Sequence, residues 1–70
     1  MKVEERNLSS RDVAILKRIY DGKTNEQIGS ELNLSKHTIK ANVADILKKM
    51  EAKNRFHAVI KAIIEKIIEI

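Results

Sequence analysis

Apolar residues recur along this 70-residue chain at the spacing of helices rather than of strands. The clearest case is the segment 36–50, where four apolar residues follow one another at intervals of four, three and four: Ile39, Val43, Ile46 and Met50. This spacing places their side chains on one face of a helix. Ser35 precedes the segment and predicts its N-cap, because a serine hydroxyl accepts a hydrogen bond from an otherwise unpaired backbone N–H.

Two shorter helices are predicted before this one. Ser9 or Ser10 opens the first helix, and Gly22 ends it, because glycine adopts the left-handed conformation of a helix end at little cost. Thr24 and Gln27 fit a capping box, in which each side chain accepts a hydrogen bond from the backbone of the other. The second helix therefore begins directly after Thr24.

The segment of about 25–50 shows the helix-turn-helix pattern, in which two helices meet through a short turn. Gly29 lies inside the first of these helices, where glycine costs about 1 kcal/mol relative to alanine. We expect its missing side chain to let the two helices approach closely. With a fourth helix, the sequence predicts an all-α, four-helix (tetrahelical) helix-turn-helix domain over residues 8–70. Residues 1–7 are expected to form an N-terminal tail in which Arg6 is solvated.

The fourth helix is predicted from about residue 55 to residue 69, and its apolar residues cover a wider arc than one core face requires. An exposed apolar surface of this kind marks an interface. We therefore expect a dimerisation helix, with an interface built from Ile60, Ile64, Ile67 and Ile68. The alternative is that this helix only closes the core of the monomer.

The net charge is concentrated in one part of the chain. The whole chain has 14 Lys and Arg against 10 Asp and Glu, a net charge of +4. Residues 36–55 hold six basic and two acidic residues and account for all of it. Ala41 and Ala44 lie among the lysines on the outer face of the helix 36–50, which makes it slim enough for the DNA major groove, about 12 Å wide. The alternative is an ordinary solvated helix face.

Composition argues against several other classes of function. The chain has no cysteine, so a disulfide, a thiolate nucleophile and a zinc–sulfur site are excluded. No apolar run approaches the roughly 20 residues of a membrane span, and the N-terminus lacks the apolar segment of a signal peptide. His37 and His57 lie on different predicted helices without co-ligands nearby. We expect a cytoplasmic protein that is not an enzyme and needs no metal, cofactor or membrane.

Four segments of the chain carry a family resemblance. They are Leu8-Ser9-x-Arg11-Asp12, Gly22-x-Thr24-Asn25-x-x-Ile28, Leu32-x-Leu34-Ser35-x-x-Thr38-Ile39-Lys40 and Arg55-x-x-Ala58-Val59. Together they resemble the LuxR-type (GerE-like) DNA-binding domain over residues 8 to about 62. The resemblance implies the tetrahelical fold, sequence-specific binding of double-stranded DNA as a homodimer through the fourth helix, and control of transcription.

The resemblance also implies roles for single residues. Lys40 would face the major groove, Ala41 would face a base, and Thr38 would bond to phosphate, as would the start of the second helix. Combined with the charge pattern, it gives the predicted DNA-binding set: Thr24, Asn25, Lys36, His37, Thr38, Lys40, Ala41, Ala44, Lys48 and Lys49.

The chain departs from the family's pattern at several positions. Asn42 replaces the usual His, Gly29 the usual Ala, and Glu51-Ala52 the usual Gly-Val. Asp45 lies where relatives often hold polar or basic residues, so it would repel phosphate or accept a hydrogen bond from a cytosine amino group. These changes are expected to affect DNA affinity and sequence preference more than the fold.

The predicted function is a stand-alone DNA-binding transcriptional regulator, because Met1 precedes the motif by about seven residues; an excised fragment would look the same. Its expected partners are double-stranded DNA, a second copy of the chain, and the transcription machinery or another regulator. The main alternative is a protein–protein antagonist that sequesters a related regulator through its apolar C-terminal helix. A promoter-reading fragment of a sigma factor is a second alternative, but the motif spacing favours the LuxR-type domain.

Overall fold

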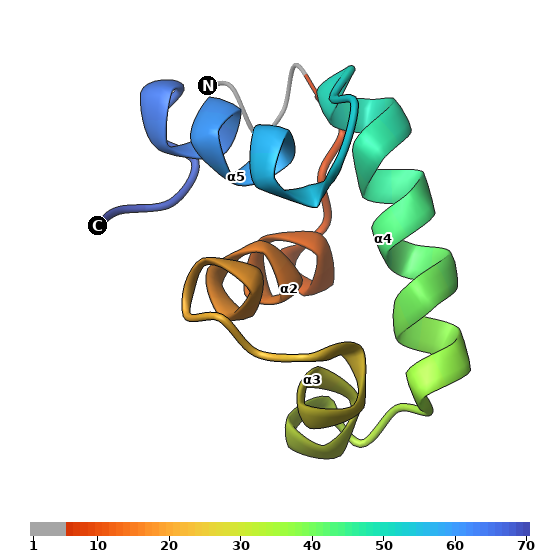
Figure 1. Cartoon of the computed structure of the whole chain (residues 1–70). Coiled ribbons are helices and arrows are strands. Elements are labelled where there is room, and N and C mark those ends of the chain that lie inside the picture. The colour runs from red at the N-terminus through yellow and green to blue at the C-terminus, as the bar shows by residue number, and fades with distance from the viewer. Residues whose placement is uncertain (1–5) are drawn as a thin grey trace.

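The computed structural model of the chain describes residues 6–70, which form four helices joined by short turns (Figure 1). The helices are α2 (Ser10–Tyr20), α3 (Asn25–Leu32), α4 (Lys36–Met50) and α5 (Arg55–Ile64). The predicted all-α, four-helix helix-turn-helix fold is confirmed. The remainder of the predicted tail, residues 1–5, lies outside the described residues.

Local hydrogen bonds set where the first two helices begin. Ser9, rather than Ser10, caps α2: its Oγ accepts the N–H of Asp12 at 3.1 Å, and the Asp12 carboxylate accepts the N–H of Ser9 at 3.0 Å. The capping box predicted at Thr24 and Gln27 is present at the start of α3. Each pair satisfies two backbone donors that would otherwise lack partners, so short stretches of sequence determine these helix starts.

One apolar core lies between the helices. Helices α2 and α5 pack against each other and against α4, while α3 packs against α4. The four predicted inner residues of α4 are all buried: Ile39, Val43, Ile46 and Met50. In Figure 1, α4 (green) runs along one side of the molecule and the other helices lie to the same side of it. The outer face of α4 is therefore left uncovered by the described part of the chain, residues 6–70.

The turn between α3 and α4 has no room for a side chain at Gly29. A Cβ atom there would lie against the carbonyl oxygen of Leu34. The N–H of Leu34 donates to the Gly29 carbonyl at 2.8 Å, and Asn33 between them adopts the left-handed conformation with φ 58°. The predicted close approach at Gly29 is confirmed, although the backbone that meets it belongs to the turn before α4.

The fourth helix is shorter than the sequence predicted. It ends at Ile64 rather than near Glu69, because Lys66 adopts the left-handed conformation with φ 61° and reverses the chain. The N–H of Ile67 then donates back to the carbonyl of Ala62 at 2.8 Å, the hydrogen bond of a Schellman helix end.

This reversal buries the last pair of adjacent isoleucines. Ile67 is 8% exposed and Ile68 is 2% exposed, and both belong to the core of the monomer. Their prediction as dimer-interface residues assumed a continuous helix that would carry them outward, whereas the reversal turns them into the core of the monomer. Ile60 and Ile64, the other two predicted interface residues, are exposed.

Arg6 is not a solvated residue of a tail. Its guanidinium donates to both carboxylate oxygens of Glu65, at 2.7 and 2.6 Å, and to the carbonyl of Lys49 at 3.1 Å. Leu8, two residues later, is buried in the core. Arg6 therefore fastens the segment before α2 to the end of α4 and to the residue that follows α5.

The residue that follows α4 provides a test of backbone strain. Glu51 adopts the left-handed conformation with φ 53°, which costs about 1–2 kcal/mol for a residue with a side chain. Glycine avoids this strain but loses part of the gain through its larger entropy in the unfolded chain. We expect Glu51→Gly to raise the free energy of unfolding by about 0.5–1 kcal/mol, measured by urea denaturation.

Glu51→Ala is the matched control for this change. It removes the same carboxylate, which lies 3.4 Å from Arg6, but keeps a Cβ atom in the left-handed conformation. A glycine variant no more stable than the alanine variant would show that position 51 is not strained.

Candidate nucleic-acid interface

The outer face of α4 holds most of the predicted DNA-binding residues. Those exposed on it are Lys36, His37, Lys40, Ala41, Ala44 and Lys48. Within residues 6–70, no carboxylate lies within ion-pair distance of any of the three lysines. The face therefore presents three unpaired cations around two small side chains, and such a surface attracts a polyanion.

The start of α4 leaves one hydroxyl group available for a further contact. The Oγ of Ser35 accepts the N–H of Thr38 at 2.9 Å and donates to Thr38 Oγ1, also at 2.9 Å. The hydroxyl hydrogen of Thr38 is then available to an acceptor outside the helix. Thr38 is half-buried at the edge of the outer face, a position compatible with its predicted bond to phosphate.

A groove beside α3 brings further predicted residues together. It has a volume of about 620 Å³ and is lined by the end of α2, the α2–α3 turn and the starts of three helices: Ile19, Gly22, Lys23, Thr24, Asn25, Glu26, Lys36, Arg55 and Phe56. Arg55 donates from Nη1 to Oδ1 of Asn25 at 2.8 Å, which ties the first residue of α5 to the first residue of α3. A helix start carries partial positive charge, which adds to that of the basic side chains around it.

Lys49 has surroundings unlike those of the other lysines of α4. Its Nζ lies 2.9 Å from Oδ2 of Asp12 and 3.2 Å from Oδ2 of Asp45. The hydrogen bond with Asp12, followed by that with Asp45, raises the pKa of Lys49 above its usual value. Two carboxylates already balance the charge of this ammonium group, so Lys49 attracts a phosphate less strongly than the lysines without an ion-pair partner do.

Asp12 is the buried carboxylate of this pair, with 3% of its surface exposed. Burial alone would raise the pKa of Asp12, but the hydrogen bonds from Lys49 and from the backbone N–H of Ser9 outweigh it and hold the pKa below its usual value. The pair joins the first turn of α2 to the last turn of α4. The sequence indicated Asp12 only as part of a family motif, and its pairing with Lys49 was missed because that partner lies 37 residues away.

Two residues that depart from the family's pattern, Asn42 and Asp45, form polar contacts within α4. The Nδ2 of Asn42 donates to the carbonyl of Thr38 at 2.7 Å, one turn earlier in α4. Asp45 is exposed on the outer face, but its carboxylate lies beside Lys49. The charge of Asp45 is thus balanced locally, which weakens the repulsion of phosphate expected from the sequence.

An apolar stripe runs along the exposed side of α5. It consists of Phe56, Ile60 and Ile64, which are 73%, 55% and 73% exposed and lie four residues apart. Phe56 was missing from the predicted interface, although it shares the spacing of the two isoleucines. An apolar groove of about 350 Å³ adjoins the stripe, between α2 and α5, with Tyr20 and Val59 among its lining residues.

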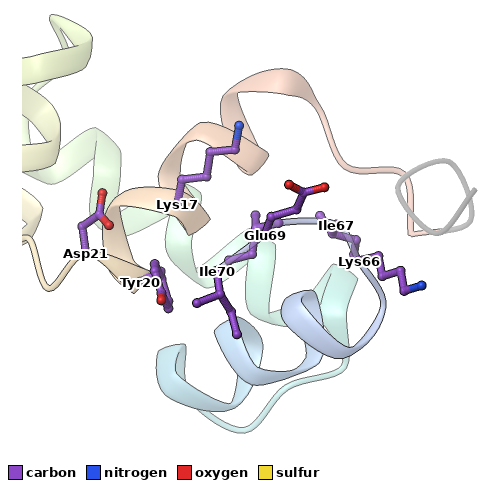
Figure 2. Close-up of a pocket in the computed structure, with 8 residues that line it drawn as sticks. Lys17, Tyr20, Asp21, Lys66, Ile67, Glu69 and Ile70 are labelled. Atoms are coloured by element: carbon purple, nitrogen blue, oxygen red, sulfur yellow. The ribbon is translucent and has the colours of Figure 1, made fainter.

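A further hollow, of about 510 Å³, lies between the end of α2 and the C-terminal segment (Figure 2). Lys17 and Lys66 in its lining are matched in charge by Asp21 and Glu69. This hollow therefore offers no excess positive charge to a polyanion, and none of the predicted DNA-binding residues lines it.

The two histidines have separate surroundings. Nδ1 of His57 accepts the N–H of Lys53 at 3.0 Å, so the ring supports the turn before α5, while His37 is exposed on α4. In the part of the chain that the structure describes, no group of three His, Cys, Asp or Glu is placed to hold a metal ion. None of the helices described is long and apolar enough to cross a membrane.

Helices α3 and α4 meet through a tight turn, and the outer face of α4 carries lysines that have no ion-pair partner among residues 6–70. This arrangement defines a helix-turn-helix domain of the nucleic-acid-binding class. The chain belongs to the LuxR family: the family described as bacterial regulatory proteins, luxR family (GerE), matches residues 6–62. The resemblance read from the sequence motifs is confirmed.

Individual relatives agree with this family. The chain is similar to the transcriptional regulatory protein LiaR of Bacillus subtilis, with 38% identity over 56 residues, which cover 80% of this chain and 26% of that protein. The transcriptional regulatory protein DegU of Brevibacillus brevis is 38% identical over 56 residues, 80% of this chain and 24% of DegU. The nitrate/nitrite response regulator protein NarP of Escherichia coli is 34% identical over 53 residues, 76% of this chain and 25% of NarP. The chain thus spans about a quarter of the length of these relatives.

The pair of Asp12 and Lys49 makes stability depend on pH in a defined direction. The pKa of Asp12 is lower in the folded than in the unfolded chain. The stabilisation that Asp12 gives the folded chain is therefore complete above its pKa in the unfolded chain, about 3.9. This stabilisation is lost as the pH falls through the lower pKa of the folded chain. We expect Asp12→Asn to lower the free energy of unfolding near neutral pH by about 1.5–3 kcal/mol, the worth of a hydrogen bond to a charged group.

Urea denaturation near neutral pH and at about pH 3 measures this dependence. The difference in stability between the unaltered chain and Asp12→Asn should shrink at the lower pH, where the carboxylate begins to take up a proton. Asp45→Asn is the control, because it removes the exposed partner of Lys49 and should cost much less. An Asp12→Asn deficit of equal size at both pH values would show that the ionised pair does not stabilise the fold.

Proposed function

We propose that this chain is the DNA-binding domain of a transcriptional regulator and binds double-stranded DNA sequence-specifically as a homodimer. The observation that carries this proposal is the outer face of α4, where three lysines without ion-pair partners among residues 6–70 surround Ala41 and Ala44. The relatives support it, since two are named transcriptional regulatory proteins and one a response regulator. We place its action in the cytoplasm, together with the transcription machinery.

In this proposal α4 enters the major groove with its outer face against the base pairs. The groove admits a helix, and the small residues Ala41 and Ala44 allow close approach. Lys40 and His37 reach the base edges, where a lysine donates to guanine acceptors, and the alanine methyl groups meet the methyl groups of thymine.

Phosphate contacts hold the domain in register on the duplex without reading its sequence. The proposed set is Thr24, Asn25, Lys36, Thr38 and Lys48. Lys49, which the sequence placed in this set, is assigned instead to the ion pairs with Asp12 and Asp45. Because those carboxylates balance the charge of its ammonium group, Lys49 is proposed to stabilise the helix that reads DNA more than to attract phosphate.

The homodimer is proposed to form through the apolar stripe of α5. A chain of this size buries only about 60% of the surface that its unfolded form exposes, and the stripe leaves three large apolar side chains in water. Packing two stripes across a two-fold axis removes them from water and presents two copies of α4 to successive major grooves, one helical turn apart. Ile67 and Ile68 take no part, because each copy buries them internally.

The same stripe supports a second candidate function, an antagonist that sequesters a related regulator in a non-productive heterodimer. The exposure of Phe56, Ile60 and Ile64 favours this candidate as much as it favours a homodimer. An antagonist that binds only through α5 would not need the lysines on the outer face of α4 that lack ion-pair partners among residues 6–70. DNA binding is therefore the first proposal.

DNA binding is tested by fluorescence anisotropy with labelled, pooled duplexes at about 50 and 200 mM salt. Affinity should fall by about 10³–10⁵ across this range if the dimer neutralises roughly six to ten phosphates. We expect Lys40→Ala to weaken binding by at least about tenfold, because a base contact is worth about 1–3 kcal/mol and each dimer loses two.

Lys17→Ala is the matched control for this experiment. It removes the same charge from an exposed lysine of α2 that lies in the hollow of Figure 2, apart from the proposed interface. Equal losses for both variants would mean that Lys40 acts only through net charge. If the unaltered chain fails to bind duplex DNA at the lower salt concentration, the antagonist becomes the better proposal.

The dimer surface is tested by Ile64→Glu. Ile64 is 73% exposed in the monomer, so a carboxylate there remains hydrated and the domain should stay folded, while a dimer that buries it should be abolished. Sedimentation equilibrium would then give a monomer mass, with an unchanged helical circular dichroism spectrum. Lys66→Glu, a new carboxylate on an exposed residue outside the stripe, should leave the mass of the dimer unchanged. A dimer that survives Ile64→Glu would locate the interface elsewhere.

A further inference from the structure

We propose that Arg55 is a positioning residue for DNA binding: it holds the side chain of Asn25 so that its NH₂ group faces the DNA backbone. This inference rests on the proposed function, in which Asn25 contacts phosphate. The positive charge of Arg55 would suit a direct phosphate contact, but its hydrogen bond to Asn25 points to a positioning role instead.

The bond between these residues joins two helix starts whose backbones are already fixed. Thr24 caps α3 through the capping box with Gln27, and the Oδ1 of Asn54 caps α5 by accepting the N–H of His57 at 2.9 Å. Between these two caps, Nη1 of Arg55 donates to Oδ1 of Asn25 at 2.8 Å, and both residues are half-buried.

The chemistry of the two groups settles which way the amide of Asn25 is turned. A guanidinium group only donates hydrogen bonds, so the atom of Asn25 that faces it is the carbonyl oxygen. The NH₂ group at the other end of the amide takes no acceptor within residues 6–70. Phosphate oxygens only accept hydrogen bonds, so this orientation suits a phosphate and the reverse orientation does not.

The groove around this amide is built for an anion to approach. Asn25 and Arg55 line it together with Lys36, and Lys36 has no ion-pair partner among the described residues. Rotating the amide by half a turn would present an oxygen to the phosphate and repel it. Arg55 prevents that rotation, and so it increases DNA affinity through Asn25 rather than through its own charge.

A double-mutant cycle on DNA affinity tests this inference, with the unaltered chain, Arg55→Met, Asn25→Ala and the variant with both changes. Methionine keeps much of the length of the side chain but removes its donors and its charge. We expect Arg55→Met to weaken binding by about tenfold, corresponding to about one hydrogen bond in each of two protomers. In the Asn25→Ala background, Arg55→Met should lower the DNA affinity less than about twofold. In both backgrounds, Arg55→Met should leave the salt dependence of binding nearly unaltered.

A direct phosphate contact gives the opposite result. The loss caused by Arg55→Met would then persist in the Asn25→Ala background, and the slope of log affinity against log salt would flatten by about 0.9 for each lost contact. Either finding overturns the positioning role. Arg55→Lys keeps both a charge and a donor and should recover most of the affinity.

A measurement on the folded chain separates this role from a loss of stability. The side-chain NH₂ signals of Asn25, identified by their absence in Asn25→Ala, should shift in the NMR spectrum when duplex DNA is added. In Arg55→Met, studied at temperatures where circular dichroism shows a folded domain, this shift should be much smaller. A shift of the same size in both proteins would overturn the inference, while a lack of DNA binding by the unaltered chain would overturn the proposed function and this inference with it.

Discussion

The ion pair between Asp12 and Lys49 fixes how the helices of this domain are arranged. Asp12 is almost completely buried, and a carboxylate is stable there only because Lys49 and the N–H of Ser9 both donate to it. The pair sets the first turn of α2 against the last turn of α4. Arg6 adds to the same corner by donating to the carbonyl of Lys49. One end of α4 is thereby anchored to the first turn of α2 and to the segment before it.

The lysines of α4 differ in whether their charge is balanced within the chain. The helix contains four lysines after Ser35, but the ammonium group of Lys49 balances carboxylates and the other three face solvent. A charge count along the sequence cannot separate a cation that stabilises a buried acid from one that meets a ligand. The net +4 of residues 36–55 therefore does not measure the charge available to a polyanion, because Asp12 and Arg6, which lie outside that segment, form ion pairs with Lys49 and Glu51 inside it.

The sequence predicted features that depend on residues close together in the chain and missed those that depend on residues far apart in it. The capping box of Thr24 and the buried face of α4 depend on residues within a few turns of each other, and both predictions were confirmed. The end of α5 was missed because Lys66 adopts a conformation that glycine usually marks. Burial of Ile67 and Ile68 against the core accompanies that conformation, and burial of this kind depends on residues far away in the sequence. The contacts of Arg6 and Asp12 were missed for the same reason, since their partners lie 59 and 37 residues away.

The two proposed surfaces meet at the start of α5. Arg55 bonds to the first residue of α3, while its neighbour Phe56 begins the apolar stripe and also lines the groove that holds Asn25. A second copy packed against Phe56 would therefore lie beside the residues that orient the amide of Asn25. In the proposed dimer, the partner's apolar stripe would therefore lie close to the proposed phosphate contact of Asn25. This shared corner would place the proposed dimer contact next to the proposed DNA contact, although the stripe itself would not touch the duplex.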